Sequence, residues 1–176
     1  AEAYTKGWGV TPNFEKANEY FERTLANVEE GDYRVHTAVA LAYKRGLGVK
    51  KNMQLAVRWL ERSVKGGEVK AKYELARIVL WGTIPNYTSK DGVRMMEESI
   101  RGDSSGPYLR LGMLYASGLV VANDYQRAMS YFKQAVELKN TDAMRQIALL
   151  YLSGFGVTAN EGKAIEWFSM AAEAGN

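Results

Sequence analysis

Apolar residues in the segment 32–67 recur at the spacing of a helical face. They lie at i, i+4, i+7 and i+8, which places them on one side of a helix: Val35, Val39, Ala42 and Tyr43. Gly46 and Gly48 then interrupt the pattern, and glycine adopts left-handed or tight turns without steric cost. A second apolar face follows Asn52 and consists of Ala56, Trp59, Leu60, Ser63 and Val64. The segment therefore predicts two helices joined by a glycine turn.

The same pattern returns every 36 residues along the chain. Three series illustrate the step, for the turn, the start of the second helix and its buried small position: Gly46, Gly82, Gly118, Gly154; Asn52, Thr88, Asp124, Asn160; and Ala56, Gly92, Ala128, Ala164. Four full frames thus run 32–67, 68–103, 104–139 and 140–175, and the segment 1–31 is a partial frame. A fixed period of this length is typical of repeat architectures.

The start of each second helix predicts both local and global structure. The residue at the start of each second helix, which is Asn13 in the partial frame, has a side chain that can accept a hydrogen bond from an N–H of the first helical turn. Such a bond typically contributes ~1 kcal/mol. One helix hairpin cannot bury its apolar face alone, so successive hairpins must stack. We therefore expect an all-α fold, a single right-handed α-solenoid domain over 1–176 built from antiparallel helix hairpins.

The residues of the frame also carry a specific family resemblance. The run ALAYKRGLGVKKNMQLAVRWLERSVKGG resembles a Sel1-like repeat, a relative of the tetratricopeptide repeat, and so does LLYLSGFGVTANEGKAIEWFSMAAEAG. A truncated copy is GWGVTPNFEKANEYFERT, so the resemblance covers essentially the whole chain. Two frames depart from it, because Ile84-Pro85 and Val120-Val121 replace the second glycine and its valine. We expect those two loops to differ in shape from the standard turn.

Composition excludes several classes of site and partner. The chain has 176 residues, 47% of them hydrophobic, a net charge of +3, no cysteine and one histidine. Disulfides, thiolate metal sites and cysteine nucleophiles are therefore excluded. No apolar run approaches the ~20 residues of a membrane span, and the balanced charge is unlike that of a dedicated nucleic-acid binder. The missing cysteines slightly favour a bacterial periplasmic or exported setting, or another secretory compartment, with the cytosol left open.

Three motifs could be read as chemistry, and each lacks its partners. His36 has no second histidine or nucleophile beside it. Ser130 and Lys133 have the Ser-x-x-Lys spacing of acyl-serine enzymes without the companion motifs. The Gly-x-Gly turns lack the strand and third glycine of a dinucleotide fingerprint. We therefore expect a protein that is not an enzyme and has no metal or cofactor.

The resemblance to tetratricopeptide relatives implies where a partner would bind. In those proteins, first-helix residues that point away from the stacking interface line a concave groove. The matching positions are Arg34, Thr37, Leu41, Lys44, Arg45; Lys70, Tyr73, Arg77, Leu80, Trp81; Leu109, Met113, Ala116, Ser117; and Asp142, Arg145, Leu149, Leu152, Ser153. Aromatic, methionine and arginine side chains commonly anchor interfaces. The candidate partner-binding residues are therefore Arg34, Tyr73, Arg77, Trp81, Met113 and Arg145.

These positions indicate a protein–protein interaction scaffold, or adaptor, whose groove takes an acidic-plus-apolar segment of a partner protein. The alternative is a bacterial inhibitor of the immunity type, which binds and silences a secreted effector enzyme. Nucleic acid is not expected, because matching positions in successive frames repeat no side-chain code. For Trp81, the alternative is a cover over the loop at 83–85. An exposed last face, with Trp167, Phe168 and Ala171, would also permit self-association through the solenoid ends.

Overall fold

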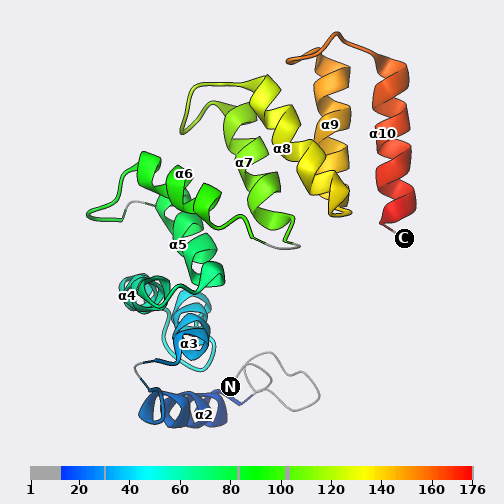
Figure 1. Cartoon of the computed structure of the whole chain (residues 1–176). Helices are drawn as coiled ribbons and strands as arrows, with labels where there is room; N and C mark the ends of the chain where they lie inside the picture. Colours follow the sequence, from blue (N-terminus) through cyan, green and yellow to red (C-terminus); the bar gives the residue numbers. More distant parts are fainter. Residues whose placement is uncertain (1–12, 30, 83, 102–103, 176) are drawn as a thin grey trace. The chain divides into compact units, whose positions relative to one another are not determined.

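The computed structural model describes residues 13–29, 31–82, 84–101 and 104–175, and all regular structure within them is α-helical. The chain forms two compact units, Ala1–Tyr87 and Thr88–Asn176. The first contains α2 (Phe14–Ala26), α3 (Tyr33–Arg45), α4 (Met53–Lys65) and α5 (Val69–Trp81). The second contains α6 (Ser89–Glu98), α7 (Gly106–Ser117), α8 (Tyr125–Glu137), α9 (Thr141–Ser153) and α10 (Glu161–Ala174) (Figure 1).

The helix starts that the repeat predicts are confirmed. The side chains of all five expected residues accept a hydrogen bond from a backbone N–H three positions on: Asn13, Asn52, Thr88, Asp124 and Asn160. Thr88 also forms a reciprocal capping box with Asp91. In three of the four full frames the first helix also begins with a side-chain cap, at Asp32, Glu68 and Asn140, which the repeat series had not singled out. The fourth, α7, begins after Ser105 without a side-chain cap hydrogen bond.

The first glycine of the turn has the conformation expected from the repeat in three frames and departs from it in one. Gly46, Gly118 and Gly154 are left-handed, with φ of 72°, 65° and 71°, and each closes its helix with a backbone hydrogen bond. Gly82 has φ −137° and is extended, so α5 ends without that bond. This departure precedes Ile84-Pro85, one of the two expected irregular loops. The expected turn at Gly7 and Gly9 lies outside the described residues.

The other irregular loop joins α7 to α8. At the matching position of the regular turn between α3 and α4, Leu47 is 9% exposed, whereas Leu119 is 86% exposed. The regular turn uses Gly48 at φ 76°, a conformation that a β-branched residue adopts only with strain. Val120 stands at that position in the α7–α8 loop. The loop therefore takes another path and projects Leu119 outward.

The core of each unit is built from the repeat positions. One position that recurs every 36 residues in the first helix of each full frame is fully buried. It is Val39 and Leu75 in the first unit, and Leu111 and Ile147 in the second. A series of the second helices is equally buried: Leu60, Met96 and Phe132. Phe168, at the same step in α10, is partly exposed, because no further helix of the described residues covers it.

Two polar residues near the start of α3 are also part of the core. Thr37 is buried, and its hydroxyl lies 2.7 Å from the Ser63 hydroxyl, which donates to the backbone oxygen of Tyr33. The Thr37 side chain, expected in the groove, is therefore largely buried, and it lines the polar cavity on the exposed side of α3. His36 is buried beside Trp59, with Nε2 3.1 Å from the Glu29 backbone oxygen. Its Nδ1 atom has no hydrogen-bond partner, and the packing around the ring indicates a structural role.

Candidate functional site

The six candidate residues fall in the two units. Arg34, on α3, and Tyr73, Arg77 and Trp81, on α5, belong to the first unit. Met113, on α7, and Arg145, on α9, belong to the second. The structure therefore supports two separate candidate surfaces, one on each unit, and each is considered by itself.

In the first unit, α3 and α5 are linked by a carboxylate that the sequence reasoning missed. Glu74 is buried, and its Oε2 atom lies 2.7 Å from Lys44 Nζ, while its Oε1 atom accepts from Arg77 Nη1 at 3.2 Å. The i, i+3 spacing of Glu74 and Arg77 was the available signal. Lys44 and Arg77 are thus held in place by an internal counter-charge, which lowers the net positive charge of this surface.

The aromatic candidates lie along the same helix. The Arg77 guanidinium carbon is 5.6 Å from the centre of the Tyr73 ring, within the range of a cation–π interaction. Trp81, the last residue of α5, is 55% exposed. Leu80, also expected in the groove, is buried, so that expectation is wrong.

Two adjacent cavities follow the exposed side of α3. An apolar cavity of about 240 Å³ lies between α2 and α3 and includes Phe21, Leu41, Arg45 and Leu47. A polar cavity of about 380 Å³ lies toward the start of α5 and includes Arg34, Glu68 and Lys70. Both are lined by Ala38 and Leu41, so these two residues form a shared wall. The apolar cavity was missed because Phe21 and Leu47 come from neighbouring frames.

Most of the positive side chains around these cavities have no strong carboxylate partner. Arg34 has a 93% exposed side chain and lies 4.0 Å from Glu68, at the limit of an ion pair. Arg45 and Lys70 are exposed, and their side chains form no ion pair with any described residue. An exposed cation without a close partner among the described residues remains available to a carboxylate from another molecule.

In the second unit, the candidate surface is largely apolar. Met113 is exposed on α7, and Leu149 and Leu152 are exposed on α9. The Arg145 guanidinium forms an ion pair with Asp142 one turn earlier on the same helix. This pair partly satisfies the arginine, so Met113 and the two leucines are the more available contacts here.

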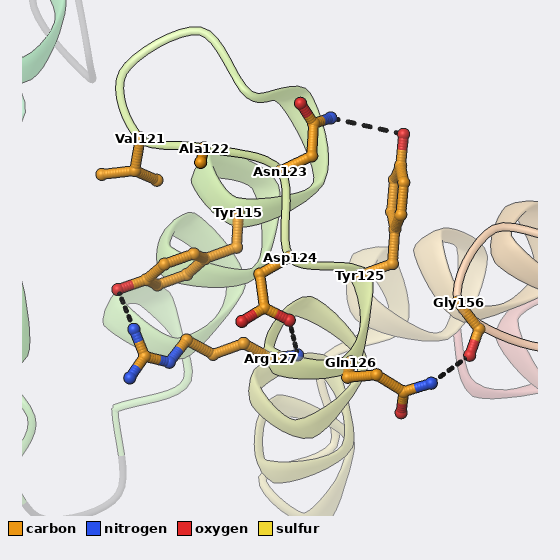
Figure 2. A pocket seen from close by; sticks show the side chains of 9 residues that line it. All are labelled: Tyr115, Val121, Ala122, Asn123, Asp124, Tyr125, Gln126, Arg127 and Gly156. Atoms are coloured by element: carbon orange, nitrogen blue, oxygen red, sulfur yellow. Dashed lines mark hydrogen bonds between the residues drawn. The ribbon is translucent and has the colours of Figure 1, made fainter.

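A further pocket of about 610 Å³ opens beside the irregular α7–α8 loop of the second unit (Figure 2). Figure 2 shows Arg127 reaching the Tyr115 hydroxyl, to which its Nη1 donates at 2.8 Å. On the other side of the start of α8, Tyr125 accepts a hydrogen bond from Asn123 and stacks on Phe155 at 4.9 Å between ring centres. Val121 lines this pocket, and the loss of the loop glycine was the only sequence signal for the pocket.

The charges beside this pocket are mutually compensating. The Tyr115 and Tyr131 hydroxyls both donate to Glu97 Oε1, at 3.5 and 3.4 Å. Burial, followed by repulsion from Glu97, raises the pKa of Tyr131 to about 12. Tyr115 raises the pKa of Arg127, so the arginine stays charged. Asp124 and Arg127 both line this pocket, so its lining has no net positive charge, and it is a weaker candidate for binding an acidic segment.

The described residues contain no group of three or more His, Asp or Glu side chains arranged to hold a metal ion. Within the same residues, no helix is both long and apolar enough to cross a lipid bilayer. The surfaces described above therefore offer hydrogen bonds, charges and apolar contact. These are the interactions by which a helical repeat protein binds another protein.

The helices, caps and 36-residue step define a helical-repeat protein. The sequence model of the Sel1 repeat matches residues 1–26, 36–68, 108–140 and 141–176, so the chain belongs to the Sel1 repeat family. Its fold is an all-α solenoid of Sel1-like repeats. The stretch between the second and third matches contains the Ile84-Pro85 departure. Proteins of this family are generally scaffolds for protein–protein interaction and typically non-catalytic.

Solved structures of similar fold cover nearly the whole chain. A Sel1 repeat protein from Oxalobacter formigenes has a TM-score of 0.77 and 22% identity over 99% of this chain and 70% of its own. The protective antigen c5321 of uropathogenic Escherichia coli, described as having an SLR fold, has a TM-score of 0.74 and 28% identity. This match covers 99% of this chain and 37% of the antigen's chain. The immunity protein Pa5087 of Pseudomonas aeruginosa has a TM-score of 0.52 and 15% identity over 92% of this chain and 74% of its own. No curated protein matches significantly.

Proposed function

We propose that this chain is a non-catalytic scaffold that binds a segment of a partner protein along the exposed sides of α3 and α5. The observation that carries the proposal is the set of outward cations on this surface. Arg34, Arg45 and Lys70 flank exposed apolar contacts and form no close ion pair with the described residues. An acidic segment with apolar side chains complements both features.

Trp81 and Tyr73 support the same surface from the α5 side. An exposed tryptophan next to a guanidinium stacked on a tyrosine is a combination that commonly carries binding energy. Glu74 fixes the position of Arg77 and so reduces the conformational entropy that the arginine would lose on binding. Met113 and Arg145 belong to the second unit and are proposed as a separate contact surface.

The proposal is tested by affinity purification from the native source, with the wild-type chain and a Trp81→Ala/Arg77→Glu double variant as baits. Mass spectrometry should find at least one protein that is depleted strongly, by about tenfold or more, with the variant. A Lys50→Glu/Lys65→Glu double variant changes two exposed charges elsewhere in the first unit and is the matched control. The same set of proteins with all three baits would contradict the proposed surface.

The immunity-type inhibitor is the second candidate function. It is favoured by one observation, the fold that this chain shares with the immunity protein Pa5087. An inhibitor would form a tight 1:1 complex that abolishes the activity of a secreted effector enzyme, whereas a scaffold would bind reversibly and leave activity intact. Assaying the captured partner with and without this chain separates the two.

Self-association is a further prediction that belongs with this function. The exposed apolar residues of α10 are Ile165, Phe168 and Met170, whereas Ala171 is buried and Trp167 is half-buried. The expected contact through Ala171 is therefore wrong, and Ile165 and Phe168 take its place. Sedimentation at increasing concentration should show association that a Phe168→Lys change weakens; a monomer at all concentrations would contradict it.

A further inference from the structure

The two cavities along α3 are complementary in character and share one wall. The cavity between α2 and α3 has Phe21, Val39 and Leu47 as apolar walls. The cavity at the start of α5 is bounded instead by the charged side chains of Arg34, Glu68 and Lys70. Since Ala38 and Leu41 line both, one ligand can occupy the two cavities at once. Ala38, one of the two residues that line both cavities, has a small and exposed side chain.

The length of this surface sets the size of the ligand. Arg34 borders one end, and Arg45 borders the other, eleven residues later on α3. At 1.5 Å per helical residue this separation is ~16 Å. An extended peptide rises ~3.3 Å per residue, so about five residues span it. Side chains two positions apart then face the same way, and they can enter the two cavities together.

The charges set the chemistry of the ligand. Arg34 and Lys70 present two cations to the polar cavity, and Glu68 is the carboxylate among them. Glu68 is already engaged, because its Oε1 atom accepts from the backbone N–H of Lys70 and its Oε2 atom lies 4.0 Å from Arg34 Nε. The Lys70 ammonium and most donors of the Arg34 guanidinium remain open to a second carboxylate.

We propose that this pair of cavities recognises an extended segment of a partner protein in which an acidic residue lies two or three positions from a bulky apolar residue. The apolar side chain enters the cavity between α2 and α3, and the carboxylate binds Arg34 and Lys70. Arg45 accommodates a further acidic residue beyond the apolar one. This inference rests on the proposed scaffold function and names the kind of segment it takes.

The test is selection from a displayed library of random twelve-residue peptides against the full chain, followed by affinity measurements on labelled copies of the enriched peptides. We expect enriched peptides to share an acidic and a bulky apolar residue two or three positions apart. Replacing the acidic residue by its amide, or Arg34 and Lys70 by Gln, should each weaken binding about tenfold or more. The two changes together should weaken binding little further, since they remove the same contact.

Two variants separate the cavities from the rest of the surface. Ala38→Trp places a bulky side chain at the wall that the two cavities share, where it should block both. Because Ala38 is at an exposed helical position, this change should abolish binding without unfolding the chain, while the Ala38→Ser variant should bind as wild type. Glu68→Gln should strengthen binding several-fold, because it removes a competing carboxylate. Lys50→Gln/Lys65→Gln is the matched control for loss of two charges and should have little effect. Circular dichroism checks the fold of each variant.

The outcomes distinguish this inference from the function on which it rests. The affinity of the enriched peptides could be unchanged by Ala38→Trp and by the Arg34/Lys70 change, and reduced by Trp81→Ala or Arg77→Glu. That result would contradict binding in the two cavities and would still support the scaffold function. Peptides without a shared acidic residue overturn the proposed chemistry. If no peptide is enriched, the cavity pair is overturned, while the affinity purification above still decides the scaffold function.

Discussion

Gly112 on α7 lies where there is almost no space for a side chain. A β-carbon built there would meet the ring of Phe132, which is fully buried against it. The absence of a side chain therefore allows α8 to approach α7 closely, with the phenyl ring as the contact. Gly162, near the start of α10, has ordinary van der Waals space and is exposed.

Gly112→Ala should therefore destabilise the protein by about 1–3 kcal/mol, because the buried Phe132 ring cannot move without repacking the core. Gly162→Ala should be neutral or stabilise by up to ~1 kcal/mol, since alanine favours the helix. Urea denaturation of both variants provides the comparison. Equal stability of the two would contradict the close approach of Phe132.

Tyr131 should ionise later than an ordinary tyrosine, with a pKa of about 12. Alkaline titration followed by tyrosinate absorbance should show a late transition that Tyr131→Phe removes. Since the folded-state pKa is above the usual value of about 10, this group stabilises the fold below pH ~10, and that contribution is lost as pH rises toward 12. Glu97→Gln should lower the transition; no shift would exclude Glu97 as a cause.

At the scale of helices and turns, the repeat step decides most of the structure. A helix start with an Asn, Asp or Thr side chain recurs because it satisfies an N–H that the helix itself leaves unpaired. Where the loop sequence departs from the repeat, the same helices are joined by a different path. The α7–α8 loop shows this at Leu119.

Leu47 and Leu119 occupy the same step of the repeat, so they form a matched pair. Leu47→Ala should cost about 2–4 kcal/mol, because it removes a buried side chain from the first unit. Leu119→Ala should change stability by no more than ~0.5 kcal/mol, since the side chain is already in solvent. Thermal and urea unfolding measure both. A large loss at Leu119 would mean that the loop packs inward.

At the scale of the whole molecule, the sequence predicts the helical repeat because the same residue pattern recurs in each frame. The family, the helix starts and the buried series all follow from the 36-residue step. The frame boundaries and the single domain remain predictions. Glu74 and the cavity between α2 and α3 were missed, because they depend on side chains that meet across frames and carry no repeated signal.

Binding to the first unit should weaken as ionic strength rises. The net charge is only +3, so attraction depends on the local cluster of Arg34, Arg45 and Lys70 and not on the charge of the whole chain. Exposed charges are screened over ~10 Å at 0.1 M salt. An enriched acidic peptide should lose affinity several-fold in high salt, whereas its amide counterpart should not; identical salt dependence would contradict the charge contact.

The irregular α7–α8 loop offers a place to add sequence to this protein. Its two ends are anchored independently of its tip, since the Gly118 N–H donates to the Leu114 oxygen and the Asp124 N–H donates to the Tyr115 oxygen. The segment between these anchors, in which the Leu119 side chain lies in solvent, can be lengthened at a small entropic cost. An epitope or a fluorescent label inserted after Leu119 would leave α7 and α8 undisturbed.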